Sequence, residues 1–357
     1  MKNKDDIKEL LDYFQNTEDK PLQFDEEAIV LAYQKDNGTQ SLPIKILSVF
    51  GGLLASLAFL GFLFIAGLYN SDVGLLVFGG VFIIGSIWIN KEYDKIIIDT
   101  VSVSSFIIGF ILLGFGCGQL KISENIVSII FIIIAFGSLS IVHNYILSFV
   151  SILIINGSIL TLFISNKDYD FIHIYVSVLA LTITYFFLKE ATIITTNKAL
   201  SKLYNPVRTG LIFSFLSGLV FLGKKGILPV SPDYIWLSSV VVILVIIYLI
   251  SVLFDVLNIT KTGHKIGIYI FTVLALLPSA LSPAISGAIL IILLSFLINY
   301  KTGLVLGIIS FIYFISQYYY DLNFTLLTKS ILLFSTGVLF IALYLFTYKK
   351  LTANEKV

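Results

Sequence analysis

The sequence predicts an all-α protein: a polytopic integral membrane helical bundle of about 12 transmembrane helices in two six-helix halves, with a short soluble helical N-terminal head. Of the 357 residues, 57% are hydrophobic and 13% are charged, whereas a typical soluble domain has about 25% charged residues. The mean hydropathy of +0.98 is too high for one aqueous core to bury. Apolar runs recur along the chain at close to the roughly 20 residues that cross a bilayer.

The N-terminal head, residues 1–43, is polar and acidic. In "DDIKELLDYF", Ile7, Leu10 and Phe14 have helical spacing, and "FDEEAIVLAYQK" predicts a second helix. Such a pair is too short for an independent core, so the head is either docked on another surface or a mobile tail. A secretory signal begins with basic residues followed by an apolar stretch. This head does not match that pattern, so the first membrane segment is expected to act as the insertion signal.

The transmembrane domain is predicted at 44–347, followed by a cytosolic tail at 348–357. Short polar turns such as "YNSD" and "NYKTG" predict antiparallel hairpins. The longest internal connection, 189–206, separates six predicted spans from the next six. The predicted spans are 44–68, 73–90, 96–119, 125–142, 146–165, 172–188, 207–223, 234–257, 265–281, 284–300, 303–320 and 324–347.

The lysine and arginine distribution predicts the orientation, because cytosolic loops carry an excess of these residues. If both termini are cytosolic, the predicted outer loops hold four lysines, whereas the inner loops hold eight lysines and one arginine. This predicts a bacterial cytoplasmic (inner) membrane protein with both termini inside. The predicted inner-loop residues are Lys91, Lys95, Lys189, Lys198, Lys202, Arg208, Lys261, Lys265 and Lys301, and the outer-loop residues are Lys121, Lys167, Lys224 and Lys225.

Charged residues inside a membrane usually mark function, but here most lie near predicted span ends. Asp99, Glu190 and Asp255 fall among inner-face lysines, where interfacial ion pairs explain them. Asn156 is the clearest polar side chain near a midplane, and an interhelical hydrogen bond is its simplest role. The row Gly210, Ser214 and Gly218 has the spacing of closely packed helices.

The segment "ALLPSALSPAISGA" (275–288) contains two helix breakers, Pro278 and Pro283. Its backbone groups need partners that lipid cannot supply. One interpretation is a tight outer hairpin. The other is a broken-helix pocket of the kind found in transporters.

Lys329 is the one basic residue placed clearly within a predicted span. It falls about 8 Å below the outer interface, a depth from which a lysine can snorkel back to water. The alternative is a fixed ion pair with Asp321 or Asp72, which fall at outer span ends. Such a pair would line a cation-bearing vestibule suited to an anionic headgroup or solute.

The sequence predicts no enzyme, no cofactor and no metal site. It has one cysteine and three scattered histidines, and phosphate-loop, zinc-protease and nucleophile-elbow motifs are missing from it. The net charge of +1 gives no field that would attract nucleic acid.

The C-terminal segment "SQYYYDLNFTLLTKSILLFSTGVLFIALYLF" (316–346) resembles the closing segment of a bacterial family of polytopic membrane proteins, domain of unknown function 4401. The tyrosine run, the "LLTKS" start of the last helix and its internal glycine carry the resemblance. That family is similar to a second membrane family, domain of unknown function 2157. The resemblance implies a membrane or periplasmic partner, a small protein named for a GDYXXLXY motif, and no site residues.

Two functions follow as hypotheses. The first is a membrane scaffold or assembly component that works with membrane partners besides the lipid bilayer, supported by the soluble head and the shortage of midplane charge. The alternative is a transporter or channel for a small solute, supported by the two expected halves and the 275–288 break.

Overall fold

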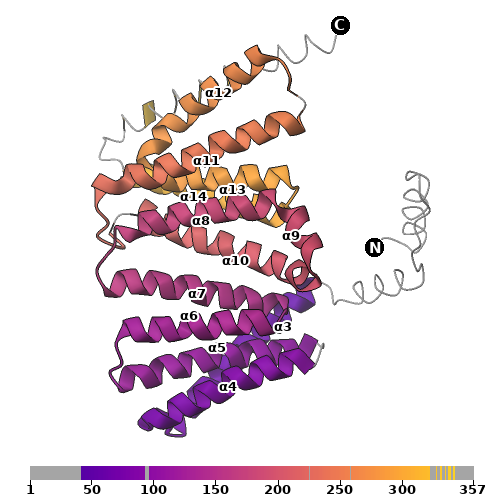
Figure 1. Ribbon diagram of the computed structural model, residues 1–357. Helices are drawn as coiled ribbons and strands as arrows, with labels where there is room; N and C mark the ends of the chain where they lie inside the picture. The colour runs from indigo at the N-terminus through magenta and orange to yellow at the C-terminus, as the bar shows by residue number, and fades with distance from the viewer. Residues whose placement is uncertain are drawn as a thin grey trace, which may run out of the picture. The chain divides into compact units, whose positions relative to one another are not determined.

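The computed structural model describes residues 42–321, with the exception of 93–95, 225 and 258. It also describes isolated positions between 327 and 341. The described residues are helical with no strands (Figure 1). Eight of their helices are long and apolar enough to cross a membrane. The predicted head lies outside the described residues except for residues 42 and 43, and the twelfth predicted span lies outside them except for the isolated positions. The C-terminal tail also lies outside them.

Contacts divide the chain into two compact units, one ending at Leu120 and the other beginning at Lys121. The described part of unit 1 contains three long helices and the short 3-10 helix η1 (Leu68–Asn70). Its α4–α5 pair approaches closely at glycines: a Cβ placed on Gly109 would lie 2.8 Å from the carbonyl oxygen of Gly79. Backbone contact of this kind is the usual way small residues pack membrane helices. The helices of unit 1 are α3 (Leu42–Ile65), α4 (Asp72–Glu92) and α5 (Ile96–Gln119).

Unit 2 contains the larger core. Buried side chains from α7, α8, α10, α11, α13 and α14 form one cluster that includes Ile183, Phe215 and Ile246, and α10 packs against both α7 and α8. The helices of unit 2 are α6 (Glu124–Ile141), α7 (Tyr145–Ser165), α8 (Phe171–Leu188), α9 (Glu190–Thr196), α10 (Lys198–Gly223), α11 (Ile235–Val256), α12 (Thr262–Leu276), α13 (Pro283–Leu297) and α14 (Lys301–Asp321).

The structure therefore corrects one part of the predicted organisation. The connection predicted at 189–206 is not a loop: α9 occupies 190–196, and α10 begins at Lys198 rather than at 207. Pro206, the last residue of that predicted connection, lies buried within α10. The Asn197 side chain caps the earlier start by accepting a hydrogen bond of 3.1 Å from the Ala199 amide.

The predicted two six-helix halves are not confirmed. The core of unit 2 includes helices on both sides of 189–206, while the contacts separate after Leu120. Two predicted spans are also shorter than expected. The span predicted at 265–281 is α12 followed by the 3-10 helix η3 (Leu277–Leu281). The span predicted at 284–300 is α13, which has 15 residues.

Candidate functional site

Unit 2 carries two polar regions toward opposite ends of α8 and α10. The arginine cluster comprises Tyr145, Phe187, Glu190, Tyr204, Asn205, Arg208, Thr209 and Tyr300. The histidine pocket is a cavity lined by His173 and by the ends of several neighbouring elements. Because His173 and Phe187 are 14 residues apart on one helix, the two regions lie about 21 Å apart along α8.

Arg208 is the centre of the arginine cluster, and its side chain is only 7% exposed. Its Nη1 lies 3.2 Å from a Glu190 carboxylate oxygen, and its Nη2 donates a 2.7 Å hydrogen bond to the Asn205 side chain. A buried charge is tolerated only when it is paired and hydrogen-bonded in this way. The sequence prediction that Arg208 lies in an inner loop is therefore wrong, because the early start of α10 places it inside the bundle.

Three aromatic rings surround the Arg208 guanidinium. Its Cζ lies 3.8 Å from the ring centre of Tyr300, 4.8 Å from that of Tyr204 and 5.7 Å from that of Phe187. These distances are within the range of cation–π attraction, which is strongest where water is excluded. The arginine Nε is buried and has no hydrogen-bond partner among the described residues.

A turn and a hydroxyl group connect Tyr300 to the other helices. Asn299, between α13 and α14, has a φ of +53°, a conformation that asparagine tolerates better than most residues. The Tyr300 amide then bonds back to the Ser295 carbonyl at 2.8 Å. The Thr209 hydroxyl lies 3.0 Å from the Tyr300 hydroxyl and 3.2 Å from that of Tyr145. The cluster thus joins α7, α8, α9, α10 and the turn that precedes α14, which is the arrangement of a structural clamp.

The histidine pocket lies at the other end of these helices and has a volume of about 710 Å³. The 3-10 break after α12 supplies part of its wall, and α14 supplies another part. Apolar and polar groups both face it, so the cavity could hold a small amphiphilic solute. Its lining includes His173, Phe221, Lys224, Leu228, Ser231, Trp236, Ala280, Ser282, Tyr318 and Asp321.

His173 is fully buried in the first turn of α8. Its Nδ1 lies 2.9 Å from the Ser238 hydroxyl on α11, which fixes the ring between the two helices. Its Nε2 is buried and makes no hydrogen bond of acceptable geometry with the described residues, although the Ser231 backbone lies close enough to interact with the ring. The imidazole of His173 is therefore a buried polar group in the wall of the cavity.

Charged side chains lie at the helix ends in and next to the pocket. The Asp170 carboxylate accepts a 2.9 Å hydrogen bond from the Ser231 amide, which ties the segment between α10 and α11 to the start of α8. Asp321 lies at the end of α14 and accepts a 3.2 Å hydrogen bond from Gln317. Lys224, at the end of α10, is exposed. Among the described residues, the lining of the pocket therefore includes one lysine, Lys224, and one aspartate, Asp321.

The structure does not bring the predicted site residues that it describes together in one place. Asp321 lines the histidine pocket, and Pro283 is buried as the first residue of α13. Pro278 lies within η3, whose residue Ala280 lines the same pocket, so the break contributes to a cavity. Asp72 is the first residue of α4 in unit 1, so its position relative to Asp321 is not described. Lys329 lies outside the described residues.

Asn156 is 7% exposed, on α7. Its side-chain oxygen accepts a 3.2 Å hydrogen bond from the Tyr175 hydroxyl on α8, and its Nδ2 donates to the Ile152 carbonyl at 2.9 Å. The Tyr175 hydroxyl also reaches the Ser214 carbonyl on α10 at 3.4 Å. Asn156 therefore serves to connect three helices.

Sequence reasoning missed the central residues of both regions. Arg208 directly precedes the apolar run that begins at 210, a position that could have indicated a charge at a helix end. His173 carried no spacing signal, because its partner Ser238 lies 65 residues further along the chain. Among the described residues, no group of three or more His, Cys, Asp or Glu side chains could hold a metal ion.

Apolar helices of spanning length, packed around buried polar groups, are the features of a helical membrane protein. The chain belongs to the family described as "Domain of unknown function (DUF4401)", which matches residues 41–350 and so confirms the resemblance seen at the C-terminus. No curated protein matches the chain. No solved structure matches it either.

Proposed function

We propose that this chain is a multi-pass protein of the bacterial cytoplasmic membrane that binds a small solute in the histidine pocket, as a transporter or channel does. The observation that carries the proposal is the pocket itself: about 710 Å³, at a helix break, with the buried imidazole of His173 in its wall. Broken helices near polar groups are the usual binding elements of transporters. The proposed role is non-enzymatic.

A substitution that fills the pocket tests solute binding. Ala280 lines the cavity, whereas Leu277, three residues earlier, is 63% exposed and does not line it. Ala280→Trp should abolish uptake by liposomes of labelled amino acids and short carboxylates, and Leu277→Trp should leave uptake unchanged. If wild-type protein moves none of these solutes and none changes its melting temperature, the proposal fails.

The membrane topology forms part of the same proposal, with about twelve spans and both termini cytosolic. Its support is the lysine distribution. Reporter fusions at Asn70, Asn197 and the C-terminus should place Asn70 outside and the other two inside. Asn197 directly follows α9. A reporter at Asn197 that is found outside would overturn the orientation.

A scaffold or assembly role is the second candidate. Its support is the resemblance to the family, which implies a partner, a small GDYXXLXY-motif protein in the same membrane or on its outer face. Purification in mild detergent separates the two candidates. A stoichiometric partner with no solute flux favours the scaffold, whereas a protein that moves solute alone favours the transporter.

A further inference from the structure

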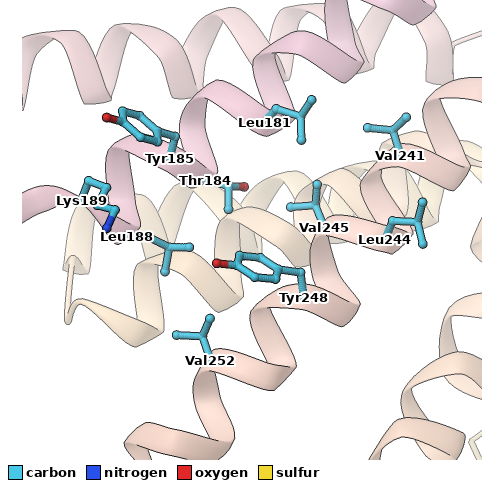
Figure 2. A pocket seen from close by; sticks show the side chains of 10 residues that line it. All are labelled: Leu181, Thr184, Tyr185, Leu188, Lys189, Val241, Leu244, Val245, Tyr248 and Val252. Carbon is cyan, nitrogen blue, oxygen red and sulfur yellow. The ribbon is translucent and has the colours of Figure 1, made fainter.

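A second cavity, distinct from the histidine pocket, is a groove of about 740 Å³ between α8 and α11. Figure 2 shows its side chains, with Lys189 at one end of the α8 row and Leu181 at the other. The Tyr248 ring extends from α11 toward α8 (Figure 2). The groove is lined by Leu181, Thr184, Tyr185, Leu188, Lys189, Val241, Leu244, Val245, Tyr248 and Val252.

The floor of this groove is closed and its sides face outward. Thr184 and Val245 are buried, and the Thr184 hydroxyl is satisfied within its own helix by the Ala180 carbonyl at 2.7 Å. Leu181, Leu244 and Tyr248 are more than half exposed. In a bilayer this open apolar side would face lipid chains.

The groove has the length of one leaflet. Leu181 to Lys189 is eight residues, or about 12 Å along α8, and Val241 to Val252 is eleven residues, or about 16 Å along α11. Half of a hydrocarbon core is about 15 Å thick. One acyl chain therefore matches the groove from the middle of the bundle to the C-terminal end of α8.

The end of the groove carries a positive charge. Lys189 follows the last residue of α8 and is exposed, and no acidic side chain in the described part of the chain pairs with it. Its neighbour Glu190 is directed instead to Arg208, 3.2 Å away. A lysine at the interface next to an apolar groove complements the phosphate of a lipid headgroup.

We propose that this groove binds one anionic phospholipid, with an acyl chain between α8 and α11 and the headgroup phosphate at Lys189. The inference shares the membrane setting of the proposed function but not its site. Failure of one therefore leaves the other standing.

Native mass spectrometry of the full chain, released from bilayers of phosphatidylglycerol or phosphatidylcholine with identical acyl chains, tests the proposal. We expect wild-type protein to retain one phosphatidylglycerol in preference to phosphatidylcholine. Lys189→Gln should lower that preference about fivefold. Lys198→Gln, which removes an exposed charge at the start of α10, should leave it unchanged.

A second variant separates the chain site from the charge. Leu244→Trp fills the groove and should remove the retained lipid, whereas Leu274→Trp, on an exposed face of α12, should not. Equal retention of both lipids, or no response to Lys189→Gln, would mean an unselective lipid layer and overturn the proposal. Disulfide formation between Leu244→Cys and cysteines placed along 324–347, in a Cys117→Ser background, would also overturn it, because the chain's own last segment would then occupy the groove.

Discussion

The arginine cluster and the histidine pocket are built on the same two helices, α8 and α10, yet they differ in how space is used. Around Arg208 the rings of Tyr204 and Tyr300 and the Glu190 carboxylate fill the volume. Around His173 the walls leave about 710 Å³ empty. The comparison shows that the contacts of Arg208 fill one end of this bundle, whereas a cavity remains at the other end.

The largest effect should come from removing the cation. Arg208→Met leaves the Glu190 carboxylate, whose side chain is 31% exposed, without its cation and the three rings without their partner, so the free energy of unfolding should fall by about 3 kcal/mol. Thermal unfolding in detergent, followed by circular dichroism, measures the change. Adding Glu190→Gln to this variant should recover much of the loss, and an unchanged melting temperature for Arg208→Met would contradict the clamp.

The helix contacts between the two ends should show the next largest effect. A Cβ on Gly218 would lie 2.8 Å from a methyl group of Val176 on α8, whereas one on Gly157 would meet nothing within 4 Å. Gly218→Val should therefore cost about 1–3 kcal/mol of overpacking strain, and Gly157→Val should not. Similar melting temperatures for the two valine variants would show that α8 and α10 are less closely packed than described.

A smaller effect is expected midway along the bundle. Tyr175→Phe removes the hydrogen bond to Asn156 while keeping the ring, so the free energy of unfolding should fall by about 1 kcal/mol. Tyr313→Phe, at a 40% exposed position on α14, serves as the control. A loss as large as that of Arg208→Met would mean that the rigid part of the bundle extends to its middle.

The smallest effect is expected at Lys329. If this lysine snorkels, Lys329→Met and Lys329→Arg should have equal melting temperatures and equal activity. The result sharpens the contrast with Arg208, whose charge is fixed by partners. A marked loss in the methionine variant alone would instead support the predicted ion pair with Asp321 or Asp72.

Much of the fold was predictable because apolar length is a direct requirement of the bilayer. The segment predicted at 96–119 coincides with α5, the one at 125–142 is shifted by one residue at both ends from α6, and the one at 172–188 starts one residue after α8 does. The predicted connection at 189–206 was wrong, because α10 continues through Pro206 although a proline inside a helix removes one backbone hydrogen bond. Here the Asn197 cap and the contacts of Arg208 and Tyr204 hold the earlier turns.

The candidate site was predictable only in part. The prolines at 278 and 283 correctly indicated a break, and Asp321 lies in the pocket beside that break. The other groups come together through long-range packing: Thr209 meets Tyr300 across 91 residues, and His173 meets Ser238 across 65. Such pairs leave no local pattern, so no periodicity or spacing in the sequence could reveal them.

The division of contacts after Leu120 has a consequence for biosynthesis. In unit 1 the closest packing is between the consecutive helices α4 and α5, so these two can pair soon after they leave the ribosome. Arg208 cannot be enclosed until Tyr300 has been made, and Tyr300 follows its cluster neighbour Thr209 by 91 residues. Arg208 therefore lacks one of its three aromatic partners while α11, α12 and α13 are synthesised. A chain truncated before Tyr300 should leave Arg208 incompletely enclosed and should be degraded faster by quality-control proteases than the full chain.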